Sequence, residues 1–258
     1  MTTIDHSIRD RIAVAICETL EPLSDVLAGW EGGSAAFDAL DGYSDIDLNF
    51  LVVDDATFDD LYAAAEQGLG IVSPITASHF VPPGRYYKLR DGGDFLLVDL
   101  SFFRVGASNH NLEVERHGRA RRLFDKADWL QSRHIDEHSL GLQRHKRRVE
   151  LQSWFPVSQS FVRKAILRGL DAEALAAFWS YTLRPLAEIL RMRYCPVRWD
   201  FGMRYMDRDL PPAVYARFRD LMFVQNVGNL ERALAEASAW GESVLGELAN
   251  TLQPPDRA

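Results

Sequence analysis

The stretch from Gly32 to Phe50 constrains the fold more than any other part of the sequence. Residues 28–34 predict a short strand that turns through two glycines and a serine into a helix. A turn at Asp41-Gly42 follows, and an apolar run from Ile46 predicts a second strand. Strands that alternate with helices over so few residues are typical of a sheet covered by helices.

Small residues stand at one end of this stretch and carboxylates at the other. Gly33 and Ser34 offer backbone N–H groups and a hydroxyl where a strand turns into a helix, a geometry suited to phosphate. Asp45 and Asp47 lie two apart at the start of a strand, so both carboxylates share one face. Such a pair repels itself unless a cation or proton lies between, which points to Mg²⁺. The stretch therefore predicts a nucleotide site.

A third carboxylate stands in a later strand signal. Asp99 is the only charge in the apolar run Phe95–Phe103, where burial is costly for a charge that faces neither a metal nor a cleft. Residues 85–89 and 95–103 flank a glycine-containing turn, which predicts a β-hairpin. We therefore expect Asp99 on a strand that neighbours the one holding Asp45 and Asp47.

These motifs resemble the signature of the polymerase-β-like nucleotidyltransferase superfamily. The resemblance covers roughly residues 30–103 and is strongest to bacterial aminoglycoside and lincosamide nucleotidyltransferases. It implies an α/β (α+β) nucleotidyltransferase domain with a mixed β-sheet, followed by an all-α helical bundle domain. It also implies that Asp45, Asp47 and Asp99 are the catalytic and metal-binding residues, and that Gly33 and Ser34 bind the nucleotide. Two Mg²⁺ ions, with ATP or another nucleoside triphosphate as co-substrate, complete the implied site.

One position departs from the pattern of this superfamily. Many members carry an arginine directly after the Gly-Ser pair, whereas Ala35 and Ala36 stand here. Basic residues from the second half of the chain are alternatives for neutralising the triphosphate, and ordinary surface roles are equally open for them: Arg144, His145, Lys146, Arg147, Arg148, Arg163, Lys164 and Arg168.

The sequence changes character near residue 135. The preceding part predicts strands as well as helices, with further strands at Ile75–Val81 and Arg122–Asp125 and a helix at Thr57–Gln67. The rest predicts helices alone, at Asp136–Phe155, Ser158–Arg168, Asp171–Arg193, Pro212–Val224 and Asn229–Leu252, with Asn229 as a cap and a disordered tail from Pro254. We therefore expect a catalytic domain over residues 1–134 and a helical substrate-binding domain over residues 135–258.

Bulk properties narrow the partners and the compartment. A net charge of −8 in 258 residues disfavours a dedicated nucleic-acid binder and fits a small or cationic partner. The two cysteines, Cys17 and Cys195, form neither a disulfide framework nor a zinc spacing. No apolar run is long enough to span a bilayer, and the N-terminus has no signal peptide pattern, so we expect a cytoplasmic protein without membrane partners.

Three functional hypotheses remain open at the level of sequence. The favoured one is an Mg²⁺-dependent nucleotidyltransferase that moves a nucleoside monophosphate, AMP from ATP, to a hydroxyl of a small molecule. An aminoglycoside or lincosamide acceptor would make it an antibiotic-resistance enzyme. The second is a nucleotidyltransferase that acts on a protein or RNA, and the third is a non-catalytic antitoxin-type module on the same fold. The sequence does not fix the acceptor, the preferred nucleotide or the oligomeric state.

Overall fold

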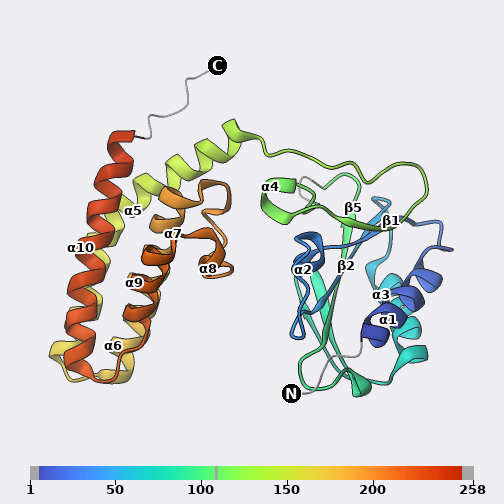
Figure 1. The fold of residues 1–258 in the computed structure, drawn as a ribbon, viewed down its shortest axis with the longest axis horizontal. Helices are drawn as coiled ribbons and strands as arrows, with labels where there is room; N and C mark the ends of the chain where they lie inside the picture. Colours follow the sequence, from blue (N-terminus) through green and yellow to red (C-terminus); the bar gives the residue numbers. More distant parts are fainter. Residues whose placement is uncertain (1–5, 108–109, 252–258) are drawn as a thin grey trace. The chain divides into compact units, whose positions relative to one another are not determined.

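The computed structural model describes residues 6–107 and 110–251. The chain divides into two units, residues 1–135 and residues 136–258. All strands of the described residues belong to the first unit, and the described part of the second unit is helical. This confirms the expected fold class, a mixed sheet with helices followed by a helical region (Figure 1). The tail from Pro254 lies outside the described residues.

The first unit is built on a six-stranded sheet of order β3-β4-β5-β2-β1-β6. The pair β2·β5 is parallel, and the other neighbouring pairs are antiparallel. The strands are β1 (Val26–Glu31), β2 (Ile46–Val52), β3 (Ile75–Val81), β4 (Gly84–Leu89), β5 (Leu97–Arg104) and β6 (Arg121–Asp125). The predicted hairpin is thus β4 and β5, joined through the 3₁₀ turn η1 (Arg90–Gly92).

Two helices, α1 (His6–Leu20) and α3 (Phe58–Val72), cover one face of the sheet (Figure 1). The alternation in β2 explains this, because Ile46, Leu48 and Phe50 are buried in the core shared with these helices. The opposite face carries a smaller apolar cluster and, farther along the same strands, polar side chains. Two short helices, α2 (Gly33–Ala36) and α4 (Val114–His117), also belong to this unit.

The second unit packs its helices around one apolar core. Its elements are α5 (Glu137–Leu167), α6 (Asp171–Phe178), the π-helical turn η2 (Trp179–Leu183), α7 (Arg184–Tyr194), η3 (Pro196–Arg198), α8 (Met206–Asp209), α9 (Pro212–Met222) and α10 (Val227–Thr251). Among the described residues, no helix is long and apolar enough to cross a membrane.

The helix break predicted at Pro156 was wrong. One helix, α5, runs through the proline, although proline inside a helix costs about 3 kcal/mol. Leu151 and Phe155 before it and Val162 after it are fully buried in the same core, so packing outweighs the lost backbone hydrogen bond.

A second proline explains the π-helical turn inside the helix predicted for Asp171–Arg193. Pro185 has no N–H to give to the carbonyl of Tyr181 four residues earlier. That carbonyl instead accepts hydrogen bonds from Gln159 Nε2 at 3.1 Å and Ser158 Oγ at 3.3 Å on α5. The side chains of α5 therefore satisfy the backbone group that the proline leaves open.

The expected cap at Asn229 was also wrong. The last helix, α10, begins at Val227, and Asn226 Oδ1 accepts the backbone N–H of Asn229 at 3.0 Å. The capping side chain is therefore the asparagine three residues earlier.

Candidate active site

A polar row crosses three adjacent strands on the sheet face opposite α1 and α3. Asp47 on β2 and Asp99 on β5 are register partners in the parallel pair, and Tyr86 on β4 is the antiparallel partner of Asp99. Register partners on neighbouring strands lie about 5 Å apart and point to the same face. The structure therefore brings Asp47 and Asp99 side by side, on neighbouring strands as the sequence predicted. We call Tyr86, Asp99 and Asp47, with Gly33 at its end, the carboxylate row.

Gly33 closes one end of the carboxylate row. A Cβ atom added to Gly33 would overlap Oδ2 of Asp47, and the φ angle of Gly33 is +54°. The preceding N–H, that of Gly32, donates to the carbonyl of Asp47 at 2.8 Å. Glycine is therefore needed at position 33 both for its backbone conformation and to let the turn pass against the Asp47 carboxylate.

Ser34 and the two alanines after it form most of α2, the short helix predicted after β1. Among the described residues, the Ser34 hydroxyl makes no hydrogen bond, which leaves it available to a ligand. Ala35 and Ala36 are buried, at 9% and 7% exposed. A larger side chain at either position would have to displace packed neighbours, so the two alanines fit this turn as it stands.

Asp45 stands immediately before β2 and reaches toward β5. Its Oδ1 accepts the backbone N–H of Leu97 at 3.4 Å. Partial burial raises the pKa of the Asp45 carboxyl, while the Leu97 N–H and the positive charge of Arg9 oppose the shift. Asp45 therefore lies next to the carboxylate row without being a register partner of Asp99.

A buried ion pair, which sequence reasoning missed, holds the backbone of Asp45. Arg9 on α1 donates to Glu31 Oε1 at 2.9 Å, and the two side chains are only 7% and 6% exposed. The same guanidinium donates to the carbonyls of Ser44 at 2.6 Å and Asp45 at 3.0 Å. Arg9 thus positions the start of β2 from the opposite face of the sheet. A charged residue inside the apolar pattern of α1 was the available sequence signal.

Strand β4 forms the other border of the carboxylate row. A Cβ atom added to Gly84 would lie 2.9 Å from Asp99 Oδ1, so this glycine also keeps backbone close to a candidate carboxylate. The neighbouring Arg85 donates to Glu66 at 2.8 Å and lies over the ring of Tyr62 at 4.4 Å. Burial raises the pKa of the Tyr62 hydroxyl to about 12, with Arg85 opposing the shift and Asp99 adding to it. Tyr62 is therefore protonated at neutral pH.

The donor set of the carboxylate row suits a magnesium ion only in part. Within residues 6–107 and 110–251, no three His, Cys, Asp or Glu side chains converge closely enough to hold a metal ion. Asp47 and Asp99 do offer carboxylate oxygens on one face. Mg²⁺ is usually bound by one or two carboxylates, with phosphates and water as the other ligands. The pair fits Mg²⁺ that arrives with a nucleotide and does not by itself form a complete three-carboxylate site.

Several basic residues of the second unit have partners within that unit. Arg147 donates to both carboxylate oxygens of Glu188, at 2.7 and 3.2 Å. Arg148 is 6% exposed and donates to Gln152 at 2.6 Å. These contacts favour a structural role for both arginines.

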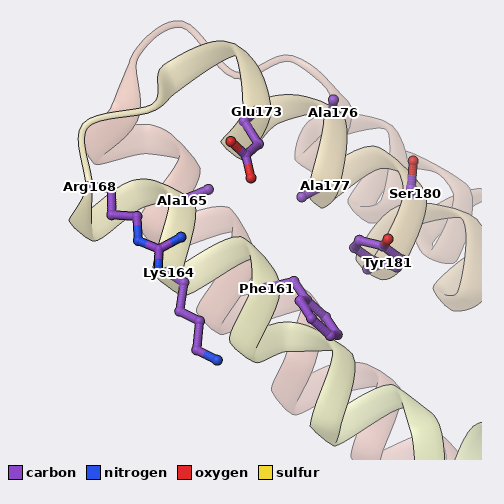
Figure 2. Close-up of a pocket in the computed structure, with 9 residues that line it drawn as sticks. All are labelled: Phe161, Lys164, Ala165, Arg168, Glu173, Ala176, Ala177, Ser180 and Tyr181. Atoms are coloured by element: carbon purple, nitrogen blue, oxygen red, sulfur yellow. The ribbon is translucent and has the colours of Figure 1, made fainter.

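Two other basic residues, Lys164 and Arg168, line a hollow of about 320 Å³ between α5 and α6 (Figure 2). Phe161 and Tyr181 form another part of its wall, with ring centroids 5.4 Å apart. Glu173 lines the same hollow, so Lys164 and Arg168 share it with a carboxylate. The hollow belongs entirely to the second unit.

Comparison with known proteins gives matches in structure alone. No family model matches the chain, and no curated protein matches its sequence. Similar solved structures include a nucleotidyltransferase-like protein from Exiguobacterium sibiricum, with 13% identity, TM-score 0.41 and coverage of 93% of this chain and 75% of that one.

Two further matches are adenyltransferases. One is spectinomycin adenyltransferase AAD(9) from Enterococcus faecialis with ATP and spectinomycin, at 11% identity, TM-score 0.40 and coverage of 96% and 98%. The other is an aminoglycoside 6-adenyltransferase from Bacillus subtilis, at 14% identity, TM-score 0.34 and coverage of 96% and 93%. At these identities and TM-scores, the matches carry no assignment of function to this chain.

Proposed function

We propose that this chain is a nucleotidyltransferase that moves a nucleoside monophosphate, AMP from ATP, to a hydroxyl of a small molecule and releases pyrophosphate. The observation that carries the proposal is the pairing of Asp47 with Asp99 in register on adjacent parallel strands, with the backbone of Gly33 against Asp47. Two carboxylates held this close are stabilised by a cation, and the glycine turn beside them offers N–H groups for phosphate.

The residues of the proposed site divide between binding the metal and binding the phosphates. Asp47 and Asp99, with Asp45 beside them, would hold Mg²⁺ on the triphosphate. Bound Mg²⁺ supplies neutralisation of the negative charge on the phosphates. Gly33 and Ser34 would hold the outer phosphates through the backbone N–H and the hydroxyl. Asp99 has two possible tasks, completing the metal site or accepting the acceptor's proton.

In the proposed reaction, the acceptor oxygen attacks the α-phosphorus in line with the leaving group. The new bond joins this oxygen to the α-phosphorus, the bond to the α–β bridging oxygen breaks, and pyrophosphate leaves with that oxygen. The hydroxyl proton passes to a base, for which Asp99 is the candidate. Catalysis of this kind rests on positioning and charge neutralisation. The carboxylate row and Arg9, which holds the backbone of Asp45, are suited to that demand.

We further propose that residues 1–134 form the catalytic domain and residues 135–258 the acceptor-binding domain. The net charge of −8 supports a cationic small acceptor, for which aminoglycosides and lincosamides are the first candidates. Modification of such an acceptor would make the protein an antibiotic-resistance enzyme. The proposal includes a cytoplasmic location, because ATP is the donor.

The test measures pyrophosphate release from each nucleoside triphosphate with Mg²⁺ across a panel of aminoglycosides, lincosamides and other hydroxyl-bearing small molecules. Asp47→Asn keeps the shape of the side chain and removes its charge, so we expect release to fall about a thousandfold while the unfolding temperature stays unchanged. Asp55→Asn, at an exposed turn aspartate, is the matched control and keeps full activity.

Two outcomes would contradict the proposal. Full turnover in Asp47→Asn would remove the carboxylate row from the chemistry. ATP binding without pyrophosphate release on any small acceptor would favour either a macromolecular acceptor, protein or RNA, or a non-catalytic module. Labelled ATP with a cell extract would separate these, because only a transferase would label a macromolecule.

A further inference from the structure

A second hollow, of about 620 Å³, lies in the first unit between α1, the loop before β2, and strands β1 and β6. Its volume lies in the range of small-molecule sites. Arg9 and Glu31 line it, and Glu31 is the register partner of Leu48, whose side chain is buried on the α1 side of the sheet. The hollow is therefore on the opposite face from the carboxylate row. We call it the α1 hollow.

The wall that α1 provides alternates acidic and apolar side chains. Asp10, Val14 and Glu18 follow one another at intervals of four, so they share one stripe of the helix. Val14 is 54% exposed, and Leu40 on the facing loop is 40% exposed. Large apolar side chains that face an open hollow provide a surface for an apolar ligand body.

Acidic side chains outnumber basic ones in the lining of the α1 hollow. Four carboxylates and two guanidiniums line it: Asp10, Glu18, Glu21, Glu31, Arg9 and Arg121. Both guanidiniums pair with the same carboxylate, Glu31, at 2.9 and 3.2 Å. Among the described side chains, none of the three remaining acids forms an ion pair.

Cys17 belongs to the lining without adding charge. Burial, as the largest cause, and the nearby charges of Glu21 and Glu18 together raise the pKa of its thiol to about 11. The thiol is therefore neutral at physiological pH and extends the apolar part of the wall. The hollow thus combines exposed apolar side chains with an acidic rim, Asp10, Glu18 and Glu21, around the buried Arg9–Glu31 pair.

The α1 hollow touches the segment that connects the glycine turn to the candidate carboxylates. Leu40 belongs to the loop between Ser34 and Asp45. Arg9 donates to the carbonyls of Ser44 and Asp45 at 2.6 and 3.0 Å while it lines the hollow. A ligand that moves Arg9 therefore acts on the backbone of Asp45 through a direct hydrogen bond, and one that moves Leu40 acts on the loop that leads to Asp45.

We propose that the α1 hollow binds a small organic cation with an apolar body, and that this ligand modulates nucleotide binding at the carboxylate row through Arg9 and the loop that holds Leu40. The ammonium group pairs with the acidic rim, and the alkyl part covers Val14 and Leu40. The position on the opposite sheet face makes the ligand an effector rather than the acceptor. The modulation, unlike the binding, rests on the proposed function.

The binding half is tested by calorimetry on the full chain, with 1,8-diaminooctane as the probe and octanoate as the anionic control. We expect the diamine to bind, octanoate not to bind, and the double variant Glu18→Gln/Glu21→Gln to weaken diamine binding about tenfold. Glu242→Gln, at an exposed acid of α10, is the matched control and binds like the wild type. Equal affinity in the double variant, or equal binding of octanoate, would overturn the site.

The modulation half is tested by measuring the affinity for ATP and Mg²⁺ with and without saturating diamine. We expect a change of about fivefold or more, and ATP must then change the diamine affinity by the same factor. An unchanged ATP affinity would overturn the modulation. Diamine binding in a protein that binds no ATP would contradict the proposed function and leave the binding site intact, so the two failures are distinguishable.

Discussion

The same sheet face carries two regions with opposite chemistry. At one end, the carboxylate row sets Asp47 beside Asp99 with the backbone of Gly33 against them. Farther along the same strands lies an apolar cluster of Ala28, Trp30, Leu51, Phe103, Leu112 and Leu130. Leu112 lies just before α4 and Leu130 just after β6, and both cover this end of the face.

This difference shows how one sheet serves stability and chemistry at once. Trp30 is 1% exposed and stacks on Phe103 at a centroid distance of 5.8 Å, so the covered end stabilises the strands. The carboxylate row contributes little packing, because its side chains are half-buried and two of them are acids. We therefore expect changes at the apolar end to lower stability, and changes in the carboxylate row to lower activity.

The largest expected effect on stability is that of Trp30→Ala. The variant loses the buried indole and leaves a cavity beside Phe103, which costs about 3–5 kcal/mol in the free energy of unfolding. Urea unfolding followed by far-ultraviolet circular dichroism measures this loss. Trp129→Ala, at a side chain that is 42% exposed, is the matched control and should cost less than about 1 kcal/mol. An equal loss in the two variants would show that the apolar cluster is not what stabilises the sheet.

A smaller effect, and one that separates the two regions, is expected for Gly33→Ala. The added methyl group would overlap the Asp47 carboxylate, and the alanine would have to adopt a φ of +54°. We expect pyrophosphate release to fall about a hundredfold, since displaced carboxylates no longer hold the phosphates, with a loss of about 1–3 kcal/mol in stability.

The matched control for this substitution is Gly42→Ala, because a Cβ atom there meets nothing within 4 Å. We expect it to keep both activity and stability. Full activity in Gly33→Ala would show that the glycine turn is not part of the site.

Local patterns were enough to predict most of the first unit. The alternation around Asp47 and the apolar run around Asp99 predicted two strands, and the hairpin signal predicted the pairing of β4 with β5. The parallel pairing of β2 with β5 is not contained in that local signal. The part that sequence could not supply is long-range. Arg9 lies 35 and 36 residues from the carbonyls that it binds, and its partner Glu31 is 22 residues away. Nothing in a local pattern tells which distant charge a buried arginine meets.

In the second unit, long-range contacts decide whether a helix continues through a proline. Proline is disfavoured inside a helix, yet helix continues on both sides of Pro156, where the sequence predicted a break, and of Pro185, where it predicted a continuous helix. Buried neighbours of Pro156 and the side chain of Gln159, which binds the freed carbonyl of Tyr181, make this possible. Both compensations depend on helices packed against each other, which a single sequence window does not contain.

The smallest expected effect is the pH dependence that Asp45 brings to stability. Burial raises the pKa of its carboxyl in the folded protein, so the folded state binds this proton more tightly than the unfolded state. The resulting stabilisation is present in full below about pH 4 and is lost as the pH rises through the folded-state pKa. Because the group is partly exposed, we expect the total to be less than about 1 kcal/mol.

Asp45→Asn removes this dependence because the amide does not titrate. We expect the unfolding temperature of the variant to rise relative to the wild type between pH 4 and pH 7, since only the wild type must ionise a partly buried carboxyl over that range. Asp94→Asn, at an exposed aspartate in the β4–β5 hairpin, is the control and should run parallel to the wild type. If Asp45→Asn also ran parallel, the carboxyl of Asp45 would be as well solvated in the folded protein as in the unfolded chain. Asp45 would then belong to the surface, and the carboxylate row would have to act without it.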